Sequence, residues 1–84
     1  MSNRFRDCSK MTEKNIKNRV KLARVEKELT QEELAKKIGV TRQTIGLIEK
    51  QEYNPTLLLC LQLSCVLGKD IDQLFWLEVK GNEE

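Results

Sequence analysis

The stretch from residue 30 to residue 50 constrains the fold of this chain more than any other, because it carries two helix starts separated by one glycine. Thr30 is followed three residues later by Glu33, the spacing at which the two residues cap each other's backbone amides at the start of a helix. Gly39 stands where a helix commonly ends in a left-handed residue. A helix over residues 31–38 is therefore predicted, and the side chains expected on its buried face are Leu34, Ala35 and Ile38.

A second helix is expected directly after that glycine. Thr41 is a good N-terminal cap, and Ile45 and Ile48 lie on one face of a helix predicted over residues 42–50. Two short helices joined by a tight turn with a glycine form a helix-turn-helix, whose second helix can enter the major groove of DNA with its N-terminal residues. The residues at those positions, which suit guanine, adenine and the thymine methyl group, are Arg42, Gln43 and Thr44.

Two further helices are expected on either side of this motif. Residues 15–27 are predicted to form the first helix of the chain, because apolar residues such as Val20 and Ala23 recur on one face. Residues 57–67 are predicted to form the fourth, between a threonine cap and Gly68. The fourth helix is apolar on nearly every side, which predicts a central position in the fold.

A short fifth helix and a strand are expected at the C-terminal end. Asp70 caps the helix, with Gln73 at the capping-box position, and after Phe75 apolar and polar residues alternate as in a strand. The predicted fold class is therefore all-α, with five helices and a short C-terminal β-strand. The predicted organisation is a flexible leader over residues 1–13, a helical domain over residues 14–75, and the strand and tail over residues 76–84.

Composition excludes several kinds of function. The 84 residues include no histidine, and the three cysteines form no CxxC pair, so a Cys/His zinc site and the commonest general base are both missing. We therefore expect no catalytic residue, no metal ligand and no cofactor. No apolar run approaches the roughly 18 residues of a membrane span. The N-terminus also lacks the apolar segment of a signal peptide, so we expect a cytoplasmic protein without a membrane partner.

Charge is distributed unevenly along the chain. Residues 1–28 carry nine Lys or Arg against four acids, a net charge of +5, whereas residues 55–84 carry two against five, a net charge of −3. A basic end is compatible with a surface that meets an anion such as DNA, although runs of charge are usually only solvated surface.

The stretch from Leu29 to Leu57 resembles the lambda-repressor-like family of helix-turn-helix regulators of bacteria and phage, also called the Cro/C1 or xenobiotic-response-element type. The resemblance rests on TQEELA, then GVTRQTI, then IE, and the YNPTL that follows favours the small dimeric branch. It implies a repressor that binds double-stranded operator DNA as a homodimer. Two other functions stay open: the antitoxin of a toxin–antitoxin pair that autoregulates its operon, and an interaction adaptor that keeps the fold without binding DNA.

The resemblance also implies roles for individual residues. The residues expected to contact DNA are Gln31, Thr41, Arg42, Gln43, Thr44, Leu47, Lys50, Tyr53 and Asn54. Of these, Tyr53 is explained equally well by packing over its own loop. Arg24 and Glu49 match a pair that ties the first helix to the third in several members. Glu28 stands where many members have glycine, and Gly46 lies inside the recognition helix, where glycine costs about 1 kcal/mol relative to alanine.

A dimer interface is expected at the C-terminal end of the chain. One recognition helix reads only about four or five base pairs, so two helices related by a two-fold axis are needed to read a longer palindrome. An alternating apolar row on a lone strand has an unpaired edge, which antiparallel pairing with a second copy would satisfy. The residues expected at the interface are Leu58, Phe75, Trp76, Leu77 and Val79.

Overall fold

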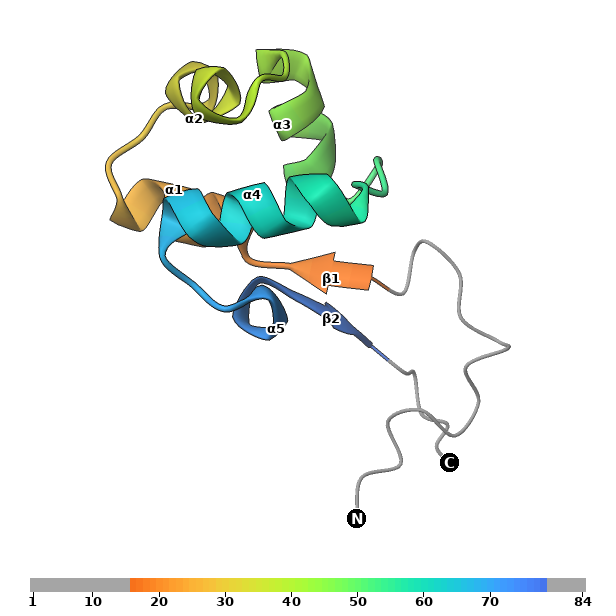
Figure 1. Cartoon of the computed structure of the whole chain (residues 1–84). Helices are drawn as coiled ribbons and strands as arrows, with labels where there is room; N and C mark the ends of the chain where they lie inside the picture. The colour runs from red at the N-terminus through yellow and green to blue at the C-terminus, as the bar shows by residue number, and fades with distance from the viewer. Residues whose placement is uncertain (1–15, 79–84) are drawn as a thin grey trace, which may run out of the picture.

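The computed structural model describes residues 16–78, which fold into five helices and a two-stranded sheet (Figure 1). In chain order the elements are β1 (Ile16–Asn18), α1 (Val20–Glu26), α2 (Gln31–Ile38), α3 (Arg42–Glu49), α4 (Leu57–Leu67), α5 (Ile71–Leu74) and β2 (Phe75–Leu77). The predicted five-helix fold is confirmed, with one strand more than the sequence suggested. The expected leader over residues 1–13 lies outside the described residues, as do Val79 and the tail that follows it.

The helices begin at the capping residues found in the sequence. The Thr30 side chain accepts a hydrogen bond from the backbone N–H of Glu33 at 3.0 Å, and Glu33 Oε1 accepts one from the backbone N–H of Thr30 at 2.8 Å. Thr41 and Thr56 accept equivalent bonds at the starts of α3 and α4. The predicted capping box of α2 and the threonine caps of the next two helices are therefore confirmed.

The hydrophobic core lies between α4 and the other helices. α4 contacts α1, α2 and α5, and it runs beneath α2 and α3 in the view of Figure 1. The largest fully buried side chains are Val20, Leu34, Ile45, Ile48, Leu63, Leu67 and Leu74. α4, which was predicted to be the central helix, packs into the core with one face, while its other face lies at the surface. No helix in the described part of the chain is long and apolar enough to cross a membrane.

The first helix is shorter than expected, because its first predicted turn is a strand. Residues 16–18 form β1, and α1 begins only at Val20. Asn18 interrupts the helix: its Oδ1 accepts a hydrogen bond from the Val20 backbone N–H at 3.1 Å, and its Nδ2 donates to the Ile48 carbonyl at 2.9 Å. An asparagine that bonds to the backbone in this way competes with helix formation, which the spacing of apolar residues does not reveal.

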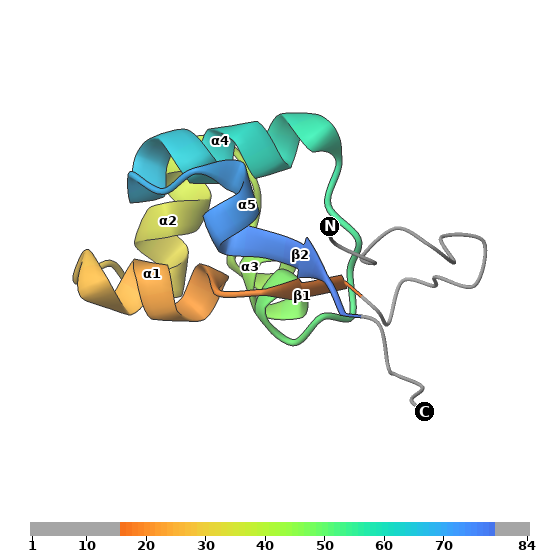
Figure 2. The ribbon, with the colours of Figure 1, turned by 90° about the horizontal axis from the view of Figure 1, so that it is seen from below.

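The C-terminal strand is paired within its own chain, so the expectation of a lone strand was wrong. β2 pairs antiparallel with β1, with Lys17 opposite Trp76, and Figure 2 shows the two strands side by side. The guanidinium carbon of Arg19 lies 4.7 Å from the centre of the Trp76 ring, a cation–π contact. Lys17 Nζ is also 3.5 Å from Glu78 Oε1. One edge of β2 is thus satisfied without a second copy of the chain.

Glu28 takes the backbone conformation that glycine adopts most easily. Its φ is +58°, in the left-handed region, and its backbone N–H donates to the Val25 carbonyl at 2.9 Å. A left-handed residue other than glycine costs about 1–2 kcal/mol. α1 therefore ends at Glu26 in a strained turn and does not run further.

Candidate nucleic-acid interface

A tight turn sets the geometry of α2 and α3. Gly39 has a φ of +78°, and the backbone N–H groups of Gly39 and Val40 both donate to the Ala35 carbonyl, at 2.9 and 3.0 Å. The Val40 side chain packs against the core. The turn brings the first residues of the two helices together: Arg42 Nη1 donates to Gln31 Oε1 at 3.1 Å.

An open hollow lies between the start of α2 and the outer face of α3, and we call it the α2–α3 hollow. It is lined by Gln31, Arg42, Gln43, Gly46, Leu47 and Lys50. Apart from Gly46, these are all residues expected to contact DNA, so the structure brings them together on one surface. The hollow thus presents flat hydrogen-bonding heads, an apolar side chain and an ammonium group, which suit base edges, thymine methyl groups and phosphate respectively.

The two threonines at the start of α3 are partly engaged by the helix cap. Thr41 Oγ1 accepts a hydrogen bond from the Thr44 backbone N–H at 3.2 Å and lies 3.0 Å from Thr44 Oγ1. Thr41 is exposed and Thr44 is half-buried. Their hydroxyls are therefore held in the cap of α3, with less hydrogen-bonding capacity to spare than free hydroxyls.

The loop between α3 and α4 carries the remaining expected DNA contacts. Gln51 has a φ of +64°, and the backbone N–H of Glu52 donates back to the Leu47 carbonyl at 2.9 Å, which folds the chain over the end of α3. Tyr53 and Asn54 follow, and both are exposed. These two residues lie outside the α2–α3 hollow, so the structure does not bring them into the same group as Arg42.

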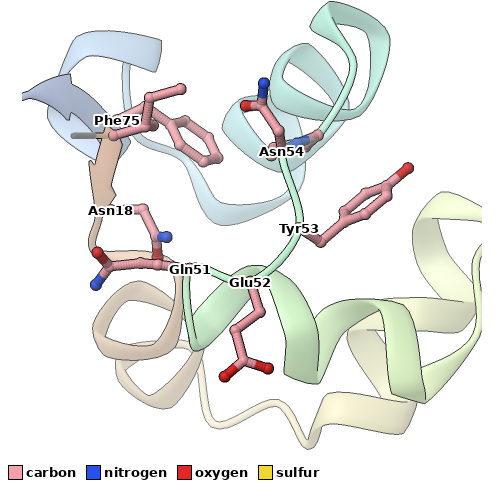
Figure 3. Close-up of a pocket in the computed structure, with 8 residues that line it drawn as sticks. Asn18, Gln51, Glu52, Tyr53, Asn54 and Phe75 are labelled. Atoms are coloured by element: carbon pink, nitrogen blue, oxygen red, sulfur yellow. The ribbon is translucent and has the colours of Figure 1, made fainter. Parts of the chain in front are cut away.

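A small pocket lies behind this loop, between it and the sheet. Its lining includes Asn18 of β1, Phe75 of β2 and Pro55 of the loop. Figure 3 shows Phe75 turned into the pocket and Tyr53 turned away from it. The volume is about 210 Å³, below the 300–1,000 Å³ typical of small-molecule sites, so the pocket does not by itself indicate a ligand.

The structure brings the expected pair of Arg24 and Glu49 together. Arg24 Nε donates to Glu49 Oε2 at 2.7 Å, and only 11% and 5% of the two side chains are exposed. Arg24 Nη1 also donates to the Leu29 carbonyl at 2.8 Å. The pair therefore ties α1, the α1–α2 connection and α3 to one another. A shielded pair of this kind is costly to break from one side, because the other charge is left without a partner.

Two polar side chains have roles that the sequence analysis missed. Asn18 supports α3 from β1 through its bond to the Ile48 carbonyl. Gln31, expected only to contact DNA, also donates from Nε2 to Glu49 Oε1 at 3.0 Å. The side chain of an asparagine can bond to the backbone where a helix begins, so Asn18 is a signal that could have placed the start of α1 after residue 18. The contact from Gln31 joins residues 18 positions apart, and no local pattern predicts it.

The residues expected at a dimer interface lie on two different elements. Leu58 on α4 is 66% exposed, whereas the residues of β2 are all half-buried. Phe75 packs against the core of its own chain, and Trp76 is covered in part by Arg19. The exposed large apolar side chains of α4, which we call the α4 leucine row, are Leu57, Leu58 and Leu61.

The cysteines of α4 differ in their surroundings. Cys60 is half-buried, and burial raises the pKa of its thiol because the thiolate would lose solvation. Cys65 is exposed. Within residues 16–78, no group of three or more Cys, Asp or Glu side chains is placed to hold a metal ion.

A five-helix domain with a polar hollow on the second helix of a helix-turn-helix belongs to the class of small helix-turn-helix proteins. The family model described as Helix-turn-helix matches residues 20–74. The chain therefore belongs to the Cro/C1 type of helix-turn-helix family, as the sequence resemblance indicated.

Curated relatives and solved structures agree with this assignment. The HTH-type transcriptional regulator YgzD of Bacillus subtilis is 43% identical over 63 residues, or 75% of this chain and 96% of that protein. An HTH-type transcriptional regulator of Methanocaldococcus jannaschii is 47% identical over 60 residues, or 71% of this chain and 91% of that protein. The crystal structure of the restriction-modification controller protein C.AhdI from Aeromonas hydrophila matches with a TM-score of 0.60 and 30% identity, covering 64% of this chain and 82% of that one. Since several relatives are archaeal, similarity to this family does not restrict the source to bacteria or phage.

Proposed function

We propose that this protein is a sequence-specific DNA-binding transcriptional regulator that represses by occupying a palindromic operator as a homodimer. The observation that carries the proposal is the α2–α3 hollow, where hydrogen-bonding side chains gather at the exposed start of the second helix of a helix-turn-helix. The names of the relatives, all HTH-type transcriptional regulators, support it. A protein of this function acts on the genome in the cytoplasm and needs no catalytic residue.

The residues of the interface are proposed to divide into two roles. Arg42 and Gln43 hydrogen-bond to base edges, with Arg favouring guanine and Gln adenine, and Leu47 contacts thymine methyl groups. Lys50 neutralises a phosphate, which contributes affinity without sequence preference. The residues proposed to contact phosphate or sugar alongside it are Gln31, Thr41, Thr44, Tyr53 and Asn54.

A second copy of the chain is proposed to cover the α4 leucine row. Leu57, Leu58 and Leu61 are 69%, 66% and 51% exposed, and apolar side chains grouped on one helix face often mark an interaction surface. A symmetric contact between two copies is the commonest form of oligomer. Residues 75–77 of β2 are proposed to extend the contact through their half-exposed side chains. Reading a palindrome on one face of DNA requires the two recognition helices of the dimer to lie about 34 Å apart.

Selection of bound sites from random double-stranded DNA tests the proposed function. The expected result is a two-fold symmetric site whose half-sites lie about 10 base pairs apart. Binding should weaken steeply with salt, because phosphate contacts release counterions. Arg42→Ala should weaken binding to the selected site. Lys36→Ala is its charge-matched control and should not, since Lys36 is an exposed residue of α2 that does not line the hollow. Selection that returns no preferred sequence would contradict the proposal and favour the adaptor function.

Light scattering at micromolar concentration tests the proposed dimer. Leu58→Glu should give a monomer, because a carboxylate would be buried in the interface. Leu22→Glu is the matched control: Leu22 is 56% exposed, but it lies on α1, outside the α4 leucine row. Two dimeric variants would move the interface away from α4. A monomeric wild-type protein would contradict the homodimer and leave the α4 leucine row open to a toxin partner.

A further inference from the structure

Four side chains form a continuous chain of hydrogen bonds from the interior of the protein to the α2–α3 hollow. Arg24 bonds to Glu49 at 2.7 Å, Gln31 Nε2 donates to Glu49 Oε1 at 3.0 Å, and Arg42 Nη1 donates to Gln31 Oε1 at 3.1 Å. The inner end is shielded and the outer end is exposed, since 5% of the Glu49 side chain is accessible and Arg42 is an exposed residue.

The shielded carboxylate determines how the Gln31 amide is turned. An ionised glutamate can only accept hydrogen bonds, so the group that Gln31 points at Glu49 must be its NH₂. The carbonyl oxygen of the same amide must then point toward the hollow. α3 leaves room for the Gln31 amide in this orientation. Even a β-carbon added at Gly46 would lie 3.8 Å from Gln31 Nε2, which is an ordinary contact.

The outward carbonyl in turn determines what can stand beside it. A carbonyl oxygen only accepts, so it stabilises a donor at the first position of α3, and Arg42 supplies one. Arginine has five N–H donors, and the bond to Gln31 uses one of them. The others stay available for the two acceptors of guanine, while the long side chain is already partly ordered before DNA arrives.

We propose that Glu49, acting through Gln31, is a positioning residue that turns the Arg42 guanidinium toward the bases and so contributes to sequence preference. This proposal rests on the proposed DNA-binding function and deepens it. Gln31 then contributes to sequence discrimination as well as to any phosphate contact, and the Arg24–Glu49 pair contributes to recognition as well as to stability.

A double-mutant cycle on the site selected by the wild-type protein tests this coupling. The base pair read by Arg42 is defined first, as the one whose preference Arg42→Ala reduces most while leaving part of it measurable. Gln31→Met keeps the length of the side chain but replaces the carbonyl oxygen by a thioether, which is only a weak acceptor, so it should lower the preference at that base pair about tenfold. In the Arg42→Ala background the same change should lower it less than about twofold. In the Gln43→Ala background, the matched control, the full effect should return.

Glu49→Gln tests the inner end of the chain. A glutamine at this position can donate as well as accept, so it no longer forces the Gln31 carbonyl outward. The preference at the base pair read by Arg42 should fall several-fold, while affinity for random DNA at low salt stays that of the wild type. NMR of the free wild-type protein is a second measurement that does not depend on the variant folding. The Gln31 side-chain NH₂ should show stronger Overhauser contacts to Glu49 than to Arg42, because its nitrogen is the end that bonds to Glu49.

The outcomes separate this proposal from the function beneath it. A wild-type protein that selects no site would overturn the proposed function itself. A wild-type protein that selects a site, with effects of Gln31→Met and Arg42→Ala that simply multiply, would overturn only the coupling and leave Gln31 as an independent contact. Contacts from the Gln31 NH₂ that are stronger to Arg42 than to Glu49 would show the amide turned the other way and overturn the role of Glu49.

Discussion

α3 and α4 bury similar side chains on their inner faces but present opposite chemistry on their outer faces. Ile45 and Ile48 of α3 and Leu63 of α4 are all fully buried in one core. The outer face of α3 carries the polar residues of the α2–α3 hollow, whereas the outer face of α4 carries the α4 leucine row.

The difference indicates what each surface requires. Arg, Gln and Lys heads are well solvated in the free protein, so the outer face of α3 is stable in water without a partner. Each exposed leucine, in contrast, would gain roughly 1.5–3 kcal/mol on full burial, before the costs of association. The α4 face is therefore the one that is stabilised when a protein covers it. The α3 face is stable in water without a partner, as the proposed DNA-binding surface must be.

The largest expected effect distinguishes the two faces of α4 itself. Leu63→Ala should destabilise the fold by about 3 kcal/mol, because Leu63 is 0% exposed and its truncation leaves a cavity. Leu58→Ala should cost less than about 0.5 kcal/mol in the monomer, since Leu58 is 66% exposed. Urea unfolding at a concentration that keeps the protein monomeric measures both, because dimerisation would add its own stability. Equal losses would show that the outer face of α4 is already covered within one chain.

A similar loss is expected where α3 is anchored. Glu49→Ala should cost about 3 kcal/mol, since it leaves the shielded Arg24 guanidinium without its carboxylate. Glu52→Ala, an exposed change three residues later, should cost less than about 0.5 kcal/mol. Thermal unfolding of the two variants compares them. Matching melting temperatures would mean that the pair holds α3 no more firmly than an ordinary surface contact does.

The next effect concerns DNA binding and leaves stability unchanged. Arg42→Ala should weaken binding to the selected site by about 2 kcal/mol and relax the preference at one or two base pairs. Lys50→Ala should weaken binding to all sequences alike and reduce the salt slope by about 1. Anisotropy titrations over a range of salt concentrations separate the two. Wild-type affinity in Arg42→Ala under matched salt would place the recognition surface elsewhere than on α3.

The sequence predicted best those parts of the fold that depend on local interactions. The Thr30–Glu33 capping box, the Gly39 turn and the threonine caps of α3 and α4 all involve residues within a few positions of one another, and each is found as predicted. The hollow followed from them, because two correctly placed helix starts bring Gln31 and Arg42 together. The side of α2 and α3 that faces outward was thus largely predictable.

The errors lie where distant parts of the chain meet. β1 forms only because residues 16–18 pair with residues 75–77, and an isolated apolar spacing around Ile16 resembles a helix equally well. The same pairing removed the lone strand on which the expected dimer interface depended. The bond from Gln31 to Glu49 also joins distant parts of the chain. The sequence therefore predicted only a DNA contact for Gln31 and not this bond within the protein.

The smallest expected effect concerns Gly46, the glycine within α3. A glycine inside a helix costs about 1 kcal/mol relative to alanine, so something must offset its cost if it is kept for a reason. The protein itself does not require it: a β-carbon at this position would lie 3.8 Å from Gln31 Nε2, an ordinary contact. Two explanations for a glycine here are that a larger residue would clash with a neighbouring side chain or that it would clash with DNA. The structure removes the first for a side chain as small as alanine.

Gly46→Ala should therefore change stability and binding in opposite directions. The free energy of unfolding should rise by up to about 1 kcal/mol, which is a shift of roughly 4–8 °C in melting temperature for a domain of this size. Affinity for the selected site should fall, because the added methyl group stands in the α2–α3 hollow where a base or sugar would approach. A variant that is more stable and binds as tightly as the wild type would show that DNA does not enter the hollow as deeply as Gly46. Only the side chains that project from the outer face of α3 would then contact DNA, and the backbone around Gly46 would not.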